Sequence, residues 1–238
     1  MTVAMNYEPP LPPAELETSP ELWAAFDLVE KAGLLEGITL EMWEHIPEEV
    51  CRDHELDRGR LIRRESGSPG HQSASLSLGA LLKAAARLAV EAEVYPCLRA
   101  SLDLDTRLWD VPGATVRKPD VLVYRCLEPG ERRLWASSVL LAVEIVSPSS
   151  EATDTGRDRR RTGFESKMTQ YARAGIRHYW IVRLKPDDSA IARIQQWRLD
   201  TELGVYVEVA AWANGETADA IRTEEPFPIQ ATWADLEF

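Results

Sequence analysis

Two continuous apolar runs in the middle of the chain, at residues 121–124 and 139–146, restrict the possible folds more than any other feature. Each run is short and bounded by turn-forming or charged residues, a pattern typical of a strand buried on both faces of a sheet. Helical spacing follows over 164–174 and ends at Gly175, and a third apolar run occupies 178–184. The order strand, strand, helix, strand predicts an α/β (α+β mixed) fold, in which helices flank a mixed β-sheet.

Further elements are predicted on both sides of this centre. Leu78, Leu82 and neighbouring alanines fall on one helical stripe, which predicts a long helix over 71–91. Arg58 and Gly59 separate two short extended runs, as in a β-hairpin. The remaining predictions are a short helix within 37–50 and strands within 98–105, 191–199 and 204–212.

The chain is expected to have two parts of different character. Residues 1–37 combine a proline-rich arm with an amphipathic helix whose apolar face could serve oligomer contact. Residues 38–238 are expected to form one folded domain around one main core.

Composition limits the class of protein. Hydrophobic residues make up 45% of the chain and charged residues 28%, an ordinary balance for a soluble globular protein. No apolar run approaches the roughly 20 residues of a membrane span, and the N-terminus lacks a signal-peptide pattern, so a cytoplasmic location without membrane contact is expected. Cys51, Cys97 and Cys126 show no CxxC spacing, so reduced, buried thiols are expected.

The formal net charge of −12 opposes binding to a phosphate backbone. Basic clusters do occur, within 156–163, at 132–133, and at four arginines between positions 58 and 64. Solvated loop charge is the commoner explanation of such runs, so they support nucleic-acid binding only weakly.

Two carboxylates stand out because of the strands that carry them. Asp120 opens one apolar run, and Glu144 lies inside the other, where an unpaired ionised carboxylate would be strongly unfavourable. If the two strands are neighbours, both side chains can converge on one hard cation, in keeping with the one or two carboxylates of most Mg²⁺ sites. Such a cation polarises a phosphoryl oxygen and lowers the pKa of bound water, the chemistry of phosphodiester hydrolysis.

A lysine on the next helix can complete this group. Lys167 shares a helical stripe with Phe164 and Tyr171, so it is predicted to point into the protein and to reach the two acids. Taken singly, Asp120 is more typical of a turn, Glu144 of a buried salt bridge, and Lys167 of a side chain covering apolar surface. Tyr171 is most simply a core residue.

The motifs PDVLVY, AVEIVSPSS and KMTQYARAGIRHYWIV, in this order, resemble the Uma-type family of predicted restriction endonucleases in the PD-(D/E)XK nuclease superfamily. Upstream, GITLEMWEHIPEE and HELDRGRLI resemble the family's opening helix and hairpin, and a helix led by His71 follows. The resemblance extends from about residue 38 to the C-terminus.

The resemblance implies a restriction-endonuclease-like core with Asp120 and Glu144 as metal ligands, the backbone carbonyl of Ile145 as a further ligand, and Lys167 as the catalytic lysine. Glu55, the glutamate of the hairpin motif, is implied as an additional acidic group of the same site. The implied cofactor is Mg²⁺ or Mn²⁺, the implied substrate is nucleic acid, expected to be DNA, and a homodimer is expected because two active sites are needed to cut two strands.

Two departures from the pattern affect this assignment. The usual superfamily lysine follows the second acid by two residues, but Val146 occupies that position here, so the role passes to Lys167, as it does in the related family. A long basic stretch at 151–166 replaces a shorter link that contains one aspartate, and either Asp154 or Asp158 could correspond to it.

Three functions remain open at this stage. The first is a metal-dependent endonuclease. The second is a catalytically silent nuclease-like module for binding or regulation, which the negative charge favours. The third is a hydrolase of a small phosphorylated substrate, which would need a narrow pocket in place of an open groove.

Overall fold

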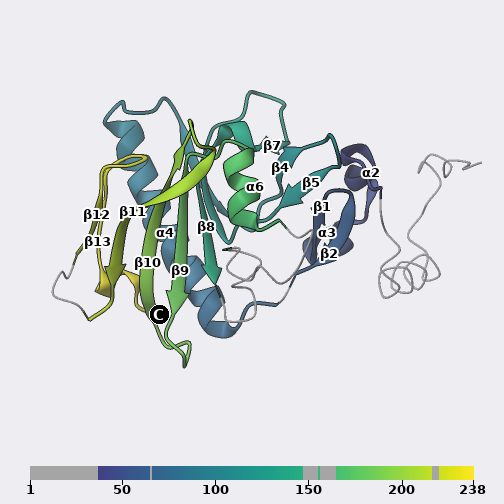
Figure 1. Ribbon diagram of the computed structural model, residues 1–238. Helices are drawn as coiled ribbons and strands as arrows, with labels where there is room; N and C mark the ends of the chain where they lie inside the picture. The colour runs from purple at the N-terminus through teal and green to yellow at the C-terminus, as the bar shows by residue number, and fades with distance from the viewer. Residues whose placement is uncertain (1–36, 65, 147–154, 156–164, 216–219) are drawn as a thin grey trace, which may run out of the picture.

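The computed structural model describes residues 37–64, 66–146, 155, 165–215 and 220–238 (Figure 1). Its helices are α2 (Leu40–His45), α3 (Glu48–Arg52), α4 (Pro69–Glu91) and α6 (Lys167–Arg173), with the short 3₁₀ helices η2 (Ala136–Ser138) and η3 (Trp233–Leu236). Its strands are β1 (His54–Asp57), β2 (Arg60–Arg63), β3 (Leu98–Leu102), β4 (Thr106–Trp109), β5 (Thr115–Arg117), β6 (Val121–Arg125), β7 (Leu134–Trp135), β8 (Val139–Val146), β9 (His178–Leu184), β10 (Ile191–Asp200), β11 (Val205–Ala213), β12 (Ala220–Thr223) and β13 (Ile229–Thr232).

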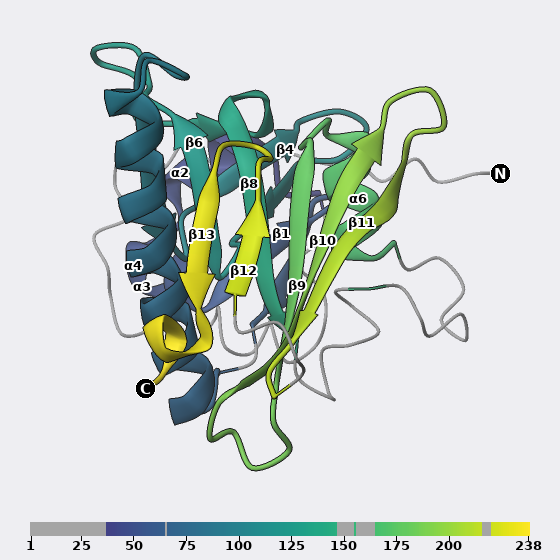
Figure 2. The same cartoon turned by 90° about the vertical axis from the view of Figure 1, so that its left-hand side faces the viewer.

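A six-stranded mixed sheet with the order β11-β10-β9-β8-β6-β3 forms the centre of the fold. Only the pairing of β8 with β9 is parallel among its strands, and helix α6 lies in the connection between these two. Helices α4 and α6 cover opposite faces of this sheet (Figure 2). Because both faces are covered, β8 is buried along its whole length, as its continuous apolar run predicts.

A second sheet, with the order β2-β1-β5-β4-β7, lies beside the first (Figure 1). Helix α2 contributes Leu40 and Trp43 to a separate small core against it, together with Leu56 and Val116. The chain passes directly from β5 of this sheet to β6 of the six-stranded sheet through residues 118–120. The two sheets therefore meet where Asp120 lies.

Helix α4 begins with a favourable cap, since the Ser68 hydroxyl accepts a hydrogen bond from the backbone N–H of His71, and Pro69 occupies the first turn. It is the one helix, within the part of the chain that the structure describes, whose length and hydropathy would suit a membrane span. A core helix of a soluble protein meets the same criterion, and α4 packs along β3, β6 and β8 as such a helix does.

Most of the predicted elements are confirmed. The hairpin, the long helix, the helix after Glu144 and the strands of the six-stranded sheet lie where the sequence places them. The single short helix predicted within 37–50 is two helices, because Pro47 has an extended backbone and separates α2 from α3. The proline-rich arm and the N-terminal helix lie outside the described residues.

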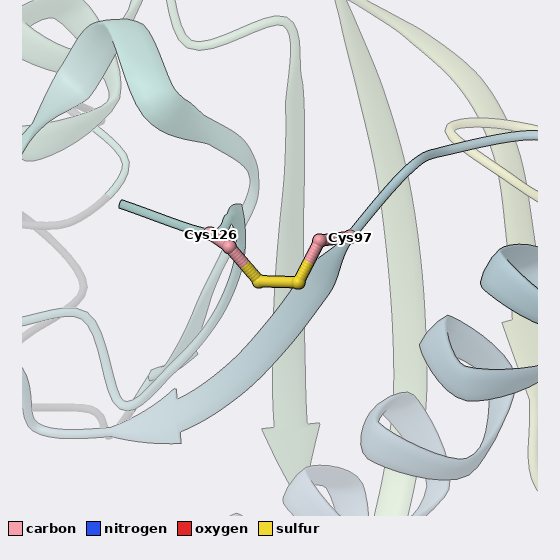
Figure 3. The surroundings of a disulfide bond; sticks show 2 residues. All are labelled: Cys97 and Cys126. Carbon is pink, nitrogen blue, oxygen red and sulfur yellow. A yellow bond between two sulfur atoms is a disulfide. The ribbon is translucent and has the colours of Figure 1, made fainter. Parts of the chain in front are cut away.

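The expectation of reduced, buried cysteines is wrong for two of the three. Cys97 and Cys126 form a disulfide with their Cα atoms 5.5 Å apart (Figure 3). Strands β3 and β6 pair antiparallel with Leu98 opposite Arg125, so the two cysteines are the next residues across this pair. Cys51 is free and partly buried, and burial followed by the nearby charge of Asp105 raises the pKa of its thiol to about 12.

Replacing both Cys97 and Cys126 by serine is expected to lower the free energy of unfolding of the oxidised protein by about 3 kcal/mol. The disulfide closes a loop with a sequence separation of 29 residues, and a loop of this size restricts the unfolded chain by about that amount. Urea denaturation of the oxidised proteins measures the change, and Cys51→Ser is the matched control. Equal stability of the double variant and the native protein would contradict the prediction.

Candidate active site

Asp120 and Glu144 come together where strand β6 begins and strand β8 ends, in the inner part of the six-stranded sheet. Val121 pairs with Val143 across the antiparallel strands β6 and β8, so Asp120 lies across from Glu144. The backbone N–H of Ile145 donates a hydrogen bond to Oδ2 of Asp120 at 2.7 Å, which fixes the aspartate beside the strand that carries Glu144. Asp120 is 6% exposed and Glu144 is 2% exposed, so both carboxylates need partners.

Lys167 supplies one of these partners. The hydroxyl of Ser166 caps the first turn of α6, and Lys167 is the first residue of that helix. Its Nζ lies 3.1 Å from Oε2 of Glu144 and 3.4 Å from Oε1 of Glu55, so it bridges two acids from two different sheets. The inward orientation predicted for this lysine is confirmed, since it is buried.

Tyr171 is a part of the site that the sequence did not indicate. Its hydroxyl donates a hydrogen bond to Oε1 of Glu144 at 2.7 Å, while its ring is fully buried in the core beneath α6. Burial and then the neighbouring charge of Glu144 raise the pKa of this hydroxyl well above 10, so it stays protonated and acts as a donor. Lys167 and Tyr171, one helical turn apart, thus hold the two oxygens of Glu144 separately.

The Tyr171→Phe variant is expected to lose about 1–3 kcal/mol of stability, because a buried carboxylate oxygen loses its hydrogen bond while the ring still fills the core. Thermal denaturation measures the loss. Tyr206→Phe is the matched control, since its hydroxyl is also buried but donates to the carbonyl of Ile176, away from the acids. Because the pKa of the folded Tyr171 hydroxyl is raised, the stability advantage of the native protein over Tyr171→Phe is expected to shrink as the pH rises above about 10, where the tyrosine of the unfolded chain ionises.

Glu55 faces the same cluster from strand β1. Its Oε1 accepts from the backbone N–H of Lys118 at 2.9 Å, and its Oε2 accepts from Nη1 of Arg117 at 2.9 Å. Burial acts to raise the pKa of Glu55, but the charges of Lys167 and Arg117 and the hydrogen bond from Lys118 outweigh it and lower the pKa to about 2. Glu55 therefore remains ionised in the folded protein at neutral and mildly acidic pH.

Acid is expected to remove the contribution of the Glu55 carboxylate to the free energy of unfolding over a defined range of pH. Because the folded pKa of Glu55 lies below its usual value of 4.5, the carboxylate stabilises the fold by roughly 3 kcal/mol above that value, and this contribution disappears as the pH falls toward 2. Urea denaturation at about pH 6 and about pH 3 measures it. The native protein should lose more stability between these pH values than Glu55→Gln, and equal losses would contradict the prediction.

Arg117 and Gln170 form the floor of the cluster. Arg117 is 1% exposed, donates from Nε to the Gln170 side chain at 2.7 Å, and lies 3.3 Å from Asp57. Gln170 in turn donates to Asp57 at 2.8 Å. Hydrogen bonds and ion pairs thus connect helix α6 to the hairpin strand β1. They fix the position of Lys167 relative to Glu55.

Asp120 has two further neighbours. Nε2 of His71, in the first turn of α4, lies 3.1 Å from Oδ1 of Asp120, so this histidine contacts the site. Burial lowers the pKa of His71, but the hydrogen bond and charge of Asp120 outweigh it, and the pKa is raised above 6.5. Arg64 lies 3.8 Å from the same oxygen and 2.5 Å from Asp103, so for Arg64 the interpretation as solvated loop charge is wrong.

The structure thus brings Glu55, Asp120, Glu144 and Lys167 together, with the backbone of Ile145 beside Asp120. The two aspartates proposed for the connection before α6, Asp154 and Asp158, lie outside the described residues. Cavities of about 610 and 350 Å³ are found elsewhere, one beside α2 and β4 and the other between the ends of β9 and β10, and neither is lined by these four residues.

The donor atoms of the cluster suit a hard cation. Asp120 and Glu144 offer carboxylate oxygens, Ile145 offers a main-chain carbonyl beside them, and Mg²⁺ normally takes one or two carboxylates and keeps several waters. In the described ranges, no three side chains of His, Cys, Asp or Glu are arranged as a metal site. A cation would therefore be held by these two acids, the Ile145 carbonyl and water, and it would share Glu144 with Lys167 and Tyr171.

Comparison with known proteins identifies the family of the chain. No curated protein matches the chain. The solved structure of a protein described as a "putative nuclease belonging to DUF820" from Anabaena variabilis matches with a TM-score of 0.53 and 18% identity, over 84% of this chain and 97% of the other, which shows a shared fold. The profile of the Uma2 family, described as "Putative restriction endonuclease", matches residues 40–223. The predicted family is therefore confirmed, and the chain belongs to the Uma2 family with a nuclease-like mixed α/β fold.

Proposed function

We propose that this protein is a divalent-metal-dependent endonuclease that hydrolyses phosphodiester bonds of DNA. The observation that carries the proposal is the convergence of Asp120 and Glu144 from neighbouring strands, with Nζ of Lys167 3.1 Å from Glu144. Two acids and a lysine in this arrangement are the groups that phosphodiester hydrolysis with one hard cation requires. Family membership supports the reaction class.

Each residue has a definite part in the proposed reaction. Asp120 and Glu144 would hold Mg²⁺ or Mn²⁺, together with the carbonyl of Ile145, and this cation supplies charge for the phosphoryl oxygen and a water of lowered pKa. Lys167 donates hydrogen bonds from Nζ, which orients the attacking water and offsets negative charge that develops on the phosphate. Glu55 pairs with Lys167 from the side opposite Glu144 and so helps to position it, and Tyr171 fixes the other oxygen of Glu144.

The partners and location belong to the same proposal. DNA must bind against a net charge of −12, so affinity is expected to depend on local basic residues and to fall steeply with added salt. A homodimer would place two sites on two strands. A cytoplasmic location is consistent with a DNA substrate, and in a reducing compartment the bond between Cys97 and Cys126 would be open.

The experiment is cleavage of supercoiled and linear DNA by the purified protein with Mg²⁺, Mn²⁺ or a chelator. Metal-dependent nicking is expected in the native protein and is expected to vanish in Glu144→Ala. Glu208→Ala is the matched control, because this glutamate lies on the outer strand β11 of the same sheet. Nicking that persists in Glu144→Ala, or in the chelator, would contradict the proposal.

A second function is favoured by one specific observation. Lys167, Tyr171 and the Ile145 N–H already pair the carboxylates of Glu144 and Asp120 without any cation. The cluster could thus be a structural network in a nuclease-like binding module, as buried ion pairs often are. For such a module, no cleavage is expected, and Mg²⁺ or Mn²⁺ would leave the melting temperature unchanged.

A further inference from the structure

Arg64 reaches the acidic cluster from the end of the hairpin. It directly follows β2, and its backbone N–H donates to the carbonyl of Asp53 at 2.8 Å, so the hairpin fixes its position. Its Nη2 lies 2.5 Å from Asp103 and 3.8 Å from Asp120, and its Nε lies 4.0 Å from Glu55. One guanidinium thus faces three carboxylates, which its planar fork of donors can serve together.

Arg64 differs from the other cations of the cluster in its exposure. The side chain of Arg117 is 1% exposed and that of Lys167 is 10% exposed, whereas that of Arg64 is 22% exposed. Its closest partner, Asp103, is 45% exposed. The guanidinium can therefore move away from Asp120 while it stays paired with Asp103 and hydrated, whereas the acids paired with Arg117 and Lys167 are themselves buried.

The backbone around Asp103 keeps this outer partner in place. Asp103 follows β3 and has a φ of +50°, in the left-handed region that aspartate tolerates better than most residues. Its N–H donates to the carbonyl of Pro119 at 3.2 Å, the residue before Asp120. Asp103 and Asp120 are thus held side by side, with Arg64 between an exposed acid and a buried one.

A divalent cation on Asp120 would meet the positive charge of Arg64 at close range. Like charges a few ångströms apart repel strongly where water is partly excluded. A guanidinium beside Asp120 therefore weakens the binding of a cation to this carboxylate, and a bound cation weakens the pairing of the guanidinium. We propose that Arg64 competes with the divalent cation for Asp120, so that it sets the metal affinity of the site and keeps this carboxylate paired when no cation is bound. The inference rests on the metal-dependent function proposed above.

A purely structural role of Arg64 leads to the opposite expectation. If the guanidinium only joined the hairpin to Asp103 and Asp120, its loss would loosen the carboxylates and would weaken cation binding or leave it unchanged. Competition requires that its loss tighten cation binding. The sign of the change in metal affinity therefore separates the two roles, and it does not depend on any activity measurement.

The experiment is calorimetric titration of the full chain with Mn²⁺, for the native protein and for Arg64→Gln, Arg64→Lys and Arg63→Gln. Arg64→Gln is expected to bind Mn²⁺ about tenfold more tightly than the native protein. Arg64→Lys keeps a charge on a flexible stem and should stay within about threefold of native. Arg63 is exposed and adjacent, so Arg63→Gln makes the same change in net charge and should have no effect beyond about threefold. Circular dichroism confirms folding of each variant.

The outcomes distinguish this inference from the function on which it rests. Mn²⁺ binding by the native protein that Asp120→Asn abolishes, together with tighter binding by Arg64→Gln alone, supports the competition. Binding by the native protein with unchanged or weaker binding by Arg64→Gln overturns the competition and leaves the proposed nuclease standing. If Arg64→Gln does not fold, Arg64→Ala takes its place with the same expectation: tighter binding by Arg64→Ala than by Arg63→Gln supports the inference, and equal or weaker binding overturns it. Absence of Mn²⁺ binding in all proteins overturns the proposed function itself.

Discussion

Lys167→Met is expected to lower kcat for DNA cleavage by at least about 100-fold, with a smaller change in KM. A positioned proton-transfer or charge-stabilising group contributes about that factor or more to a hydrolysis, and methionine fills the space of the lysine stem without its charge. The effect should be larger on kcat than on KM because Nζ is paired with the buried acids Glu144 and Glu55, where the proposed reaction would place the scissile phosphate and not the rest of the substrate. Steady-state cleavage of a short labelled duplex measures both constants.

The control for this prediction is Lys83→Met, which removes an exposed lysine from α4. It changes the net charge equally, so it corrects for the general loss of attraction to DNA. Thermal denaturation of both variants checks that the lysine is not needed for folding. A Lys167→Met protein that is folded and retains more than about a tenth of the native kcat would exclude a catalytic role for this lysine.

Arg117→Met is expected to lower the free energy of unfolding by about 3–5 kcal/mol, the largest effect on stability anticipated for this protein. The substitution leaves Glu55, Asp57 and the side-chain oxygen of Gln170 without their shared buried partner, and a buried carboxylate that loses its cation is strongly destabilising. Urea denaturation measures the loss, and a fall of roughly 10 °C in melting temperature should accompany it.

Two comparisons make the result interpretable. Arg87→Met removes an arginine whose side chain is 75% exposed and which pairs with Glu91, and such a surface pair should be worth less than about 1 kcal/mol. Adding Glu55→Gln to Arg117→Met should restore part of the lost stability, because one of the unpaired charges is then absent. A loss of free energy of unfolding below about 1 kcal/mol for Arg117→Met would contradict the prediction. It would mean that water or rearranged side chains stabilise Glu55 and Asp57 as well as Arg117 does.

The residues that the sequence could identify are those whose local pattern already conflicts with a simple core. Glu144 interrupts a continuous apolar strand, and Lys167 lies on the inner stripe of a helix, so each calls for a partner before any coordinates are known. The meeting of Glu144 with Asp120 was predicted only on the condition that their strands are neighbours, and the pairing of β6 with β8 fulfils that condition. Glu55 needed the resemblance to a family, since a hairpin glutamate is otherwise unremarkable.

The parts that the sequence could not reveal depend on contacts between distant segments. Tyr171 has the pattern of a core residue, and only the position of its hydroxyl relative to Glu144 shows its second role. Arg64 meets Asp103 and Asp120 only after the two sheets are assembled, and Cys97 meets Cys126 only through the register of β3 with β6. Strands β4, β5 and β7 are too short to show a period of their own.

Residues 118–120, the three-residue passage from β5 to β6, make the site sensitive to how the two sheets move relative to each other. Glu55 belongs to the five-stranded sheet, whereas Glu144 belongs to the six-stranded one. Lys167 bridges them, with its Nζ 3.4 Å from Glu55 and 3.1 Å from Glu144. A displacement of one sheet against the other would therefore change the distance from Lys167 to at least one of these acids. The separation of the lysine from its two acids thus depends on the packing between the sheets as well as on the residues of the site itself.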